Sequence, residues 1–401
     1  MRIYDGLEID KIPVLEEFKF SRMAYSVRST PQGIPLQFSL QIHITDFCNL
    51  RCVHCYDANR SEVHMSYELF EKIIDEFMIF LRSHKYIGQI LITGGEPILH
   101  PELFKMLDYL YAYYERGYLF KVVFETNGTL VNDVFMKRAQ AYSSMLHEVQ
   151  ISVDGCQSVH DQIRGKGAFI ATVNALKKFV EAGFKTALSF VVSKMNKEDA
   201  VSVLKLAEEL AVGRVTISRM IPIGSNELCS TSQCLSKQEF HDLWKQLNDY
   251  ANKMVERIIQ GEAKTFLCRQ RCDLWHLADI DTAVKQWLVP GSPRYLLAGI
   301  QCQAGSSILA VLPDGTVYPC RRFPKKIGDF HSDTMKSLLF ENDVQKNMRM
   351  RKFNMTGKCK NCDFYTDKAL KPLCSGGAPC LAVAYGKTIN DPDPLCWIHD
   401  D

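Results

Sequence analysis

Apolar and polar positions follow two different periods along the first half of the chain. Short apolar runs predict six strands, at 39–45, 88–93, 120–125, 148–153, 185–192 and 214–220. The segments between them have helical periodicity, and in 66–82 an apolar residue recurs at every fourth position, at Leu69, Ile73, Phe77 and Leu81. Strands that alternate with helices through short links predict a parallel sheet.

The number of strand–helix units decides between a closed and an open barrel. A full eight-unit barrel usually needs about 250 residues, whereas about 190 residues lie between positions 39 and 225. We therefore expect an α/β fold with a partial (β/α)6 TIM-like barrel. In such folds the chemistry takes place at the carboxyl ends of the strands.

Beyond the barrel the pattern changes twice. The residues from Ser236 to Glu239 form a capping box that predicts a long helix over 237–260, and 262–297 has weak periodicity. Two short β runs in 306–320 flank Pro313-Asp314-Gly315, which predicts a β-hairpin. The chain thus divides into an N-terminal extension (1–37), a barrel (38–235), a helical bridge (236–297) and a cysteine-rich domain (298–401).

Composition narrows the classes of protein. Among 401 residues 46% are hydrophobic, which supports a large core, and a formal net charge of +2 gives no support for a nucleic-acid partner. No run of about 18 apolar residues predicts a membrane helix, and the N-terminus has no apolar signal core, so we expect a cytoplasmic protein. In a reducing cytosol the fifteen cysteines indicate metal or cluster ligands rather than disulfides.

Three of these cysteines lie on the loop that leaves the first predicted strand. Cys48, Cys52 and Cys55 have the spacing C-x3-C-x2-C. Three thiolates on one loop can hold three irons of a 4Fe–4S cube and leave the fourth iron open, whereas electron-transfer clusters use four cysteines. A zinc site, for which His43 would be a fourth ligand to consider, and reduced structural thiols are the alternatives.

A second motif follows at the end of the next strand, where Gly94, Gly95 and Glu96 precede Pro97. Glycines allow a ligand to approach the backbone closely, and a carboxylate can hold an ammonium group. Together with the cysteine triplet, this motif resembles the radical S-adenosylmethionine (SAM) superfamily over roughly residues 38–225.

The resemblance implies a SAM site and its chemistry. The open iron would bind the methionine part of SAM, Gly94, Gly95 and Glu96 would meet its amino group, and Tyr56 would lie over adenine. Ser152 and Arg164 would hold its carboxylate, for which arginine offers a bidentate match. The alternatives are that Ser152 is only a residue at the end of a strand and that Arg164 is a surface charge. Reductive cleavage of SAM would give a 5′-deoxyadenosyl radical that abstracts hydrogen from a substrate.

The C-terminal cysteines resemble the SPASM domain, the cysteine-rich tail of radical SAM enzymes that modify peptides and proteins. The resemblance implies two auxiliary 4Fe–4S clusters, one on Cys302, Cys320 and Cys380 and one on Cys359, Cys362, Cys374 and Cys396. Ala378 stands where the family has a cysteine, so Cys380 would replace it. The fourth ligand of the first auxiliary cluster stays open between Cys268, Cys272 and the substrate, and two zinc sites are the alternative to both clusters.

The SPASM resemblance favours an oxidoreductase that matures a ribosomally made peptide, by oxidation or by a thioether or carbon–carbon crosslink. A small-molecule or tetrapyrrole-modifying enzyme is the alternative, and a non-catalytic scaffold is a third reading. Anaerobic sulfatase maturases carry an acid directly after the hairpin cysteine, whereas here Arg321 and Arg322 follow Cys320. These arginines would meet an acidic peptide or form a solvated pair of charges.

The partners follow from the same resemblance. Peptide maturases often carry an N-terminal leader-recognition domain, and about 37 residues precede the first predicted strand here. We therefore expect that a separate protein presents the peptide, that leader recognition is dispensable, or that the substrate is different. Flavodoxin or ferredoxin would be the reductant. The general base stays open, with Asp273, Asp279 and Asp281 as candidates.

Overall fold

The computed structural model describes residues 37–57, 61–84, 86–118, 120–224, 229–268, 271–277, 302–362 and 374–398. Its centre is a ten-stranded sheet in the order β10-β9-β8-β1-β2-β3-β4-β5-β6-β7, with β10 and β7 at its two ends. The barrel strands are β1 (Gln37–Thr45), β2 (Ile87–Gly94), β3 (Phe120–Thr126), β4 (Leu146–Ser152), β5 (Thr186–Val192), β6 (Arg214–Arg219) and β7 (Phe266–Cys268). All neighbours in this series are parallel, which confirms the α/β partial barrel.

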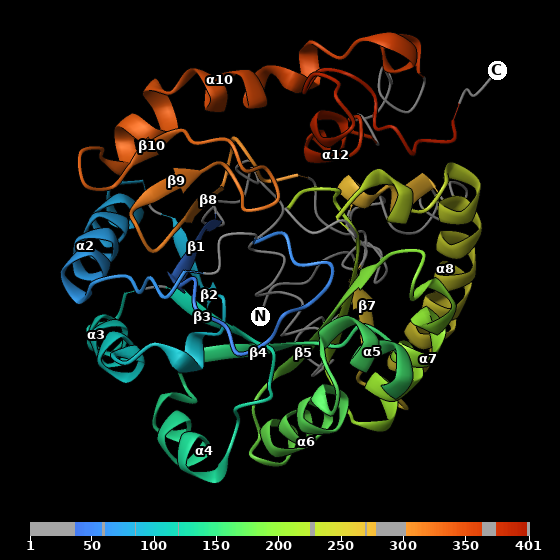
Figure 1. The fold of residues 1–401 in the computed structure, drawn as a ribbon. Helices are drawn as coiled ribbons and strands as arrows, with labels where there is room; N and C mark the ends of the chain where they lie inside the picture. Colours follow the sequence, from blue (N-terminus) through green and yellow to red (C-terminus); the bar gives the residue numbers. More distant parts are fainter. Residues whose placement is uncertain are drawn as a thin grey trace.

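The barrel helices lie outside this curved sheet (Figure 1). They are α2 (Tyr67–His84), α3 (Leu103–Glu115), α4 (Asp133–Ala139), α5 (Gln157–Arg164), α6 (Ala168–Glu181), α7 (Ala200–Glu209) and α8 (Lys237–Ile259). Each of the six predicted strands is present with its bounds shifted by at most two residues. The capping box of α8 is confirmed, since Glu239 N donates to Ser236 Oγ over 3.3 Å and Ser236 N donates to Glu239 Oε2 over 2.8 Å.

The two faces of the barrel strands differ in polarity. Alternate side chains of β1, namely Phe38, Leu40, Ile42 and Ile44, belong to the hydrophobic core that α2 also joins. Successive side chains of a strand point to opposite faces, so Ser39, Gln41 and His43 face the inside of the barrel. There Ser39 Oγ donates to Gln89 Oε1 over 3.2 Å. The inside of this barrel is therefore lined with polar groups.

The segment expected as a bridge contributes to the barrel itself. Its long helix is α8, and β7 adds a seventh parallel strand because Thr216 of β6 pairs with Cys268. The weak periodicity of 262–297 conceals this strand, since three residues are too few to show an alternation. Positions 278–297 lie outside the described residues.

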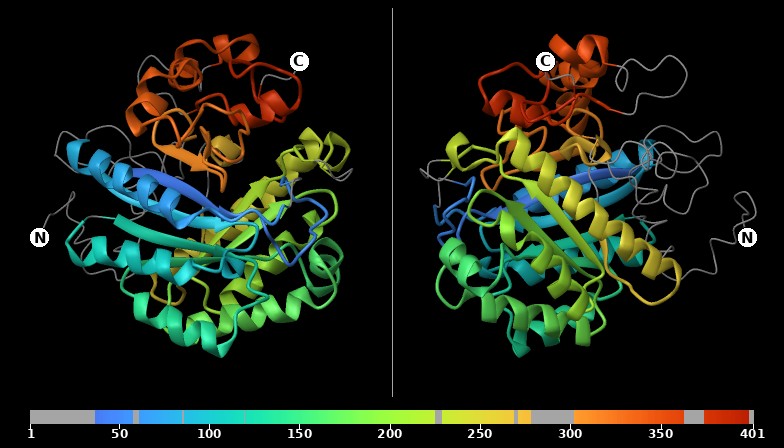
Figure 2. Two further views of the ribbon diagram at one scale, coloured as in Figure 1. Left: turned by 60° about the vertical axis from the view of Figure 1, so that its left-hand side comes forward. Right: turned by 90° about the vertical axis from the view of Figure 1, so that its right-hand side faces the viewer.

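The C-terminal part extends the barrel sheet. The predicted hairpin is confirmed as β8 (Ile308–Val311) and β9 (Thr316–Tyr318), with Gly315 at φ +85° in the turn, and β10 (Gly328–Asp329) follows. β8 pairs in parallel with β1, from Ser39 opposite Ile308 to Ile42 opposite Val311. The helices α10 (Asp343–Met350) and α12 (Pro379–Ala384) lie beyond the hairpin, on one side of the barrel (Figures 1 and 2).

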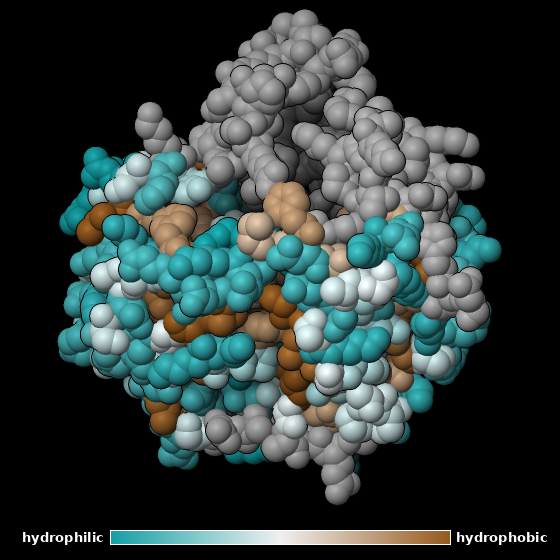
Figure 3. Space-filling view, turned by 90° about the horizontal axis from the view of Figure 1, so that it is seen from above, coloured by the Kyte–Doolittle hydropathy of each residue, from teal (hydrophilic) through white to brown (hydrophobic). Residues whose placement is uncertain are grey.

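The surface of the described part is largely hydrophilic when seen from above, and hydrophobic residues form short strips between polar ones (Figure 3). Among the described residues, no helix is both long and apolar enough to span a membrane.

Candidate active site at the mouth of the barrel

The cysteine loop is fixed to the end of β2 by backbone contacts. Gly95 N donates to Thr45 O over 2.7 Å, and Glu96 N donates to Phe47 O over 2.8 Å. A Cβ added at Gly94 would lie 2.2 Å from Thr45 O, and one at Gly95 would lie 2.3 Å from Phe47 O. The two glycines are therefore required by the packing of the cysteine loop; their contact with a ligand remains a prediction.

Polar donors lie near two of the three thiols of this loop, those of Cys48 and Cys52. Leu50 N lies 3.4 Å from Cys48 Sγ, Asn127 Nδ2 lies 4.0 Å from the same sulfur, and Arg164 Nη1 lies 4.0 Å from Cys52 Sγ. Burial raises the pKa of Cys48 to about 11, so its proton would leave in exchange for a bound cation. Three thiols on one loop, with donors near two of them, fit the thiolate ligands of an iron–sulfur cluster.

Glu96 is fully buried and joins the ends of β2 and β3. Its carboxylate accepts hydrogen bonds from Thr126 Oγ1 over 2.7 Å, from Asn127 N over 2.8 Å and from Ile98 N over 3.2 Å. Burial raises the pKa of Glu96 to about 7. The carboxylate thus holds Asn127 beside Cys48, and its contact with an ammonium group remains a prediction.

Arg164 is a buried residue of the site, and its reading as a surface charge is wrong. Its side chain is 10% exposed, and Nε lies 2.5 Å from Oδ2 of the fully buried Asp154. The same oxygen lies 3.3 Å from Nε2 of His54, a residue of the cysteine loop. Burial alone would raise the pKa of Asp154, but Arg164 and His54 hold it below its usual value, so Asp154 is an anion that fixes both side chains. Ser152 ends β4, opposite Ser189 of β5.

The hairpin meets the cysteine loop through Arg321. Its guanidinium lies 4.7 Å from the ring centre of Tyr56 and 3.5 Å from Asp57 Oδ1. Arg321 is 7% exposed, so the reading of Arg321 and Arg322 as a solvated pair is wrong. His43, at the upper end of β1, is fully buried, and neither ring nitrogen has a hydrogen-bond partner among the described residues. Burial and the nearby Arg321 lower the pKa of His43, which keeps the imidazole neutral.

The cysteines predicted to hold the second auxiliary cluster lie together. Cys359, Cys362, Cys374 and Cys396 line one cavity with Leu274 and Leu277. Burial, together with the negative charges of the other three cysteines, raises the pKa of Cys359 to about 12. Gly376 N donates to Cys374 Sγ over 3.3 Å. Four buried thiols around one cavity, with a backbone donor to sulfur, fit a four-cysteine cluster.

A thiol of the bridge segment interacts electrostatically with the first auxiliary set. Burial raises the pKa of Cys272, and the negative charges of Asp273, Cys302 and Cys380 act in the same direction, whereas Arg322 acts against them. Burial and Cys302 likewise raise the pKa of Cys320. Cys268 lies elsewhere, on β7 opposite Thr216. Within the described ranges, no three His, Cys, Asp or Glu side chains are arranged to hold a single metal ion.

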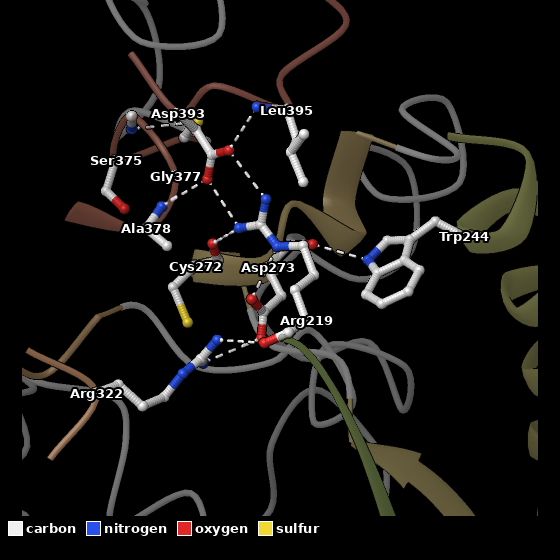
Figure 4. A network of polar contacts seen from close by, with 12 residues as sticks. Arg219, Trp244, Cys272, Asp273, Arg322, Ser375, Gly377, Ala378, Asp393 and Leu395 are labelled. Atoms are coloured by element: carbon white, nitrogen blue, oxygen red, sulfur yellow. Dashed lines mark hydrogen bonds and ion pairs between the residues drawn. The ribbon is translucent and has the colours of Figure 1, made fainter. Parts of the chain in front are cut away.

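A buried polar network joins the barrel, the bridge and the C-terminal part (Figure 4). Arg219, at the end of β6, binds Asp273 Oδ1 over 3.0 Å and both oxygens of Asp393 over 2.9 and 2.8 Å. Trp244 Nε1 donates to Asp273 O over 2.7 Å. Since Asp273 is buried between charged partners, its role as a general base finds no support here; Asp279 and Asp281 lie outside the described residues.

Several residues of the site carry no motif that sequence reasoning could use. Asn127 and Asp154 do follow strands at the barrel mouth, and that position was the available signal. Nothing in the sequence pairs Arg219 with Asp393, which stand 174 positions apart.

Comparison with known proteins gives two family matches. A family model described as "Radical SAM superfamily" matches residues 42–207, and one described as "Iron-sulfur cluster-binding domain" (SPASM) matches residues 302–363. Mycofactocin maturase MftC of Mycobacterium ulcerans (strain Agy99) is 28% identical and covers 91% of this chain and 89% of its own. AdoMet-dependent heme synthase of Methanosarcina barkeri (strain Fusaro / DSM 804) is 26% identical and covers 88% and 94%.

The fold also resembles a solved structure described as "Native anSMEcpe with bound AdoMet and Cp18Cys peptide". The TM-score is 0.69, the sequence identity is 19%, and the match covers 90% of this chain and 94% of that one. At this identity the likeness concerns the fold alone.

Proposed function

Since this chain is a radical SAM enzyme with a C-terminal SPASM domain, and uses iron–sulfur clusters and SAM as cofactors, we propose that it matures a peptide or protein. The reaction would remove hydrogen from a substrate residue and pass an electron to the auxiliary clusters. The product would be an oxidised residue, or a thioether or carbon–carbon crosslink in a ribosomally made peptide.

One observation carries this proposal. The residue after Cys55 and the residue after Cys320 are in direct contact, because the guanidinium of Arg321 lies 4.7 Å from the ring centre of Tyr56. This contact follows from the pairing of β8 with β1. A substrate bound at this contact would face both the SAM-binding loop and the first auxiliary set, so that hydrogen removal and electron transfer can occur at one place.

The side chains of the site have separate tasks in this proposal. When bound, SAM and the reduced cluster supply the carbon radical that removes hydrogen. Cys48, Cys52 and Cys55 would hold that cluster, while Arg164, oriented by Asp154, would bind the carboxylate of SAM as a bidentate donor. Gly94, Gly95, Glu96, Ser152 and Tyr56 would complete the SAM site. The buried surroundings of Arg164 and Asp154 exclude water, which strengthens these electrostatic contacts.

The relatives support two substrate classes. The mycofactocin maturase, which covers 91% of this chain, favours a peptide, and the heme synthase, which covers 88%, favours a tetrapyrrole as the second candidate. We favour the peptide because the SPASM resemblance points to it. Sulfatase maturation is disfavoured, since the buried Arg321 occupies the position where those enzymes carry an acid.

For the first auxiliary cluster we propose Cys272 as the fourth ligand, together with Cys302, Cys320 and Cys380. Cys359, Cys362, Cys374 and Cys396 would hold the second. Replacement of Cys272 by alanine should change the EPR spectrum of one auxiliary cluster, whereas Cys268→Ala should leave all spectra unchanged. The reverse result would assign the ligand to Cys268, and no change in either variant would leave the fourth position to the substrate.

The partners proposed are flavodoxin or ferredoxin as reductant and a separate leader-recognition protein. The compartment proposed is the cytoplasm, where reduced thiols persist.

The test of the function is anaerobic reconstitution followed by a SAM cleavage assay with dithionite. Three clusters correspond to about twelve irons in the wild-type protein and about eight in the Cys48/Cys52/Cys55→Ala variant. 5′-Deoxyadenosine should form only with the wild type. Bound zinc without SAM cleavage would contradict the proposal. Faster SAM cleavage with a tetrapyrrole, and none with peptides encoded beside the gene, would favour the second candidate.

A further inference from the structure

The two adjacent arginines after Cys320 point to different surroundings. Arg321 contacts Tyr56 and Asp57 on the cysteine loop. Arg322 contacts the turn that carries Cys272 and Asp273. The proposed function assigns no task to Arg322, although it lies at the thiol set of the first auxiliary cluster.

Hydrogen bonds fix the position of the Arg322 side chain. Nη1 lies 3.5 Å from Asp273 Oδ2, and Nη2 donates to Arg219 O over 3.1 Å. Its side chain is 28% exposed, so it is partly shielded from solvent. The backbone N–H of Arg322 donates to the thiol of Cys320. Figure 4 shows the sulfur of Cys272 pointing toward Arg322.

Asp273 holds Arg322 in place, and its own negative charge also acts on Cys272. The other oxygen of Asp273 is bound by Arg219, which also binds both oxygens of Asp393. The positive charges of the two arginines equal the negative charges of the two carboxylates in this network. The thiols add negative charge when they lose their protons to bind iron. Of the two guanidinium groups in the network, that of Arg322 interacts electrostatically with Cys272, Cys320 and Cys380.

We propose that Arg322, aligned by Asp273, is a positioned charge that raises the reduction potential of the first auxiliary cluster. Reduction adds one electron to a cluster that already carries negative charge with its thiolates. A nearby cation stabilises the reduced state more than the oxidised state. No proton enters this step, and in a redox titration the electron comes from the added chemical reductant.

This inference rests on the proposed clusters but not on the proposed substrate. A purely structural role predicts something else: Arg322 would hold the 271–273 turn, and its loss would reduce iron content without a selective change in potential. The two roles therefore differ in a quantity that can be measured without any substrate.

The experiment is an EPR-monitored redox titration of the full chain with Cys48, Cys52 and Cys55 replaced by alanine, so that only the auxiliary clusters contribute. Arg322→Gln should lower the potential of one auxiliary cluster, and the second cluster serves as an internal control. Arg322→Lys keeps the charge and should restore most of the shift. Arg257→Gln, which breaks an exposed pair with Glu208, should change neither potential.

Equal potentials in the wild type and Arg322→Gln, or equal shifts with lysine and glutamine, would overturn the inference. If the glutamine variant takes up fewer irons, Arg322→Met, which keeps the apolar stem, replaces it in the same titration. Absence of both auxiliary signals in the parent protein would instead refute the cofactor assignment of the proposed function.

Discussion

The cysteine loop of the barrel and the cysteines of the C-terminal part differ in what holds them in place. The loop is fixed by the protein, through backbone bonds from Gly95 and Glu96 and from Val53 N to Ile163 O over 2.9 Å. The second auxiliary set lies between short elements, such as the turn of helix at Gly357–Asn361 and α12. Its thiols line a cavity, although Cys374 and Cys396 also belong to the hydrophobic core.

Cysteine therefore serves two purposes in the same chain. In the barrel a loop held by backbone bonds would present its thiols to the proposed cluster that binds SAM. In the C-terminal part the cluster is expected to complete the fold, because a structural metal site contributes its binding free energy to folding.

Removal of the clusters should have the largest effect on the difference in stability between the two regions. Oxidation followed by chelation should unfold residues 302–398 and leave the barrel folded, since structural metal sites are worth on the order of 10 kcal/mol. Limited proteolysis should then cut the C-terminal part first. The Cys48/Cys52/Cys55→Ala variant should resist proteolysis like the wild type. Equal resistance of the stripped and loaded proteins would mean that the C-terminal part folds without metal.

The next largest effect is expected from Arg219, which joins the two regions. Its replacement by methionine leaves Asp393 buried without its cation and leaves Asp273 with Arg322 alone, which should cost about 3–5 kcal/mol of unfolding free energy. The matched control is Arg257→Met, which removes an exposed pair with Glu208 and should cost less than about 1 kcal/mol. Denaturant unfolding measures both, and similar costs would show that the network does not couple the regions.

Acid should weaken the barrel selectively. Burial lowers the pKa of the fully buried His160 to about 4, so the unfolded state binds the proton more strongly. The stability due to neutral His160 is present above its unfolded pKa of about 6.5 and is lost as the pH falls toward 4. Between pH 7 and 5.5 the loss should be about 1.2 kcal/mol.

Thermal unfolding of the wild type and His160→Gln across that range checks this expectation. The variant should show a smaller decrease in stability with falling pH. His43, His54, His100 and His147 also have lowered pKa values, so part of the decrease should remain. An identical decrease in both proteins would contradict the assignment to His160.

The smallest effect concerns the helix that connects the two regions. Ser236→Ala removes the side-chain acceptor of the capping box of α8 and should cost about 0.5–1 kcal/mol. Iron content and SAM cleavage should stay at the wild-type level, because α8 contributes no thiol. Loss of an auxiliary cluster in this variant would show that the C-terminal part depends on α8 more than its contacts indicate.

Much of the fold was predictable because strand and helix periodicities are local. The six barrel strands, α2, α8 and the hairpin all follow from apolar spacing, a cap or a turn motif within their own segments. β7 was missed because three residues show no period. The pairing of β8 with β1 was beyond reach, since a hairpin carries no signal for the strand it joins.

The candidate site, like the fold, was predictable where its signals lie within one segment of the chain. Spacing identified the thiols and the Gly94-Gly95-Glu96 motif, yet it could not separate Cys268 from Cys272, whose positions differ by only four residues. Only the fold shows that Cys268 lies on β7 and that Cys272 lies on the turn bound by Arg219 and Arg322. Burial of Arg321 was unpredictable for the same reason, because a Cys-Arg-Arg run in a polar segment usually lies in solvent.

The sequence by itself determined the chemistry that this protein can perform, because cysteine spacing and glycine positions act over a few residues and are legible in one segment. The tertiary structure alone decided how the parts cooperate. It brings Arg219 to Asp393, Tyr56 to Arg321 and Arg322 to Asp273, contacts that join distant segments. Such contacts depend on how the whole barrel and its extended sheet pack together, and a local sequence pattern does not contain that information.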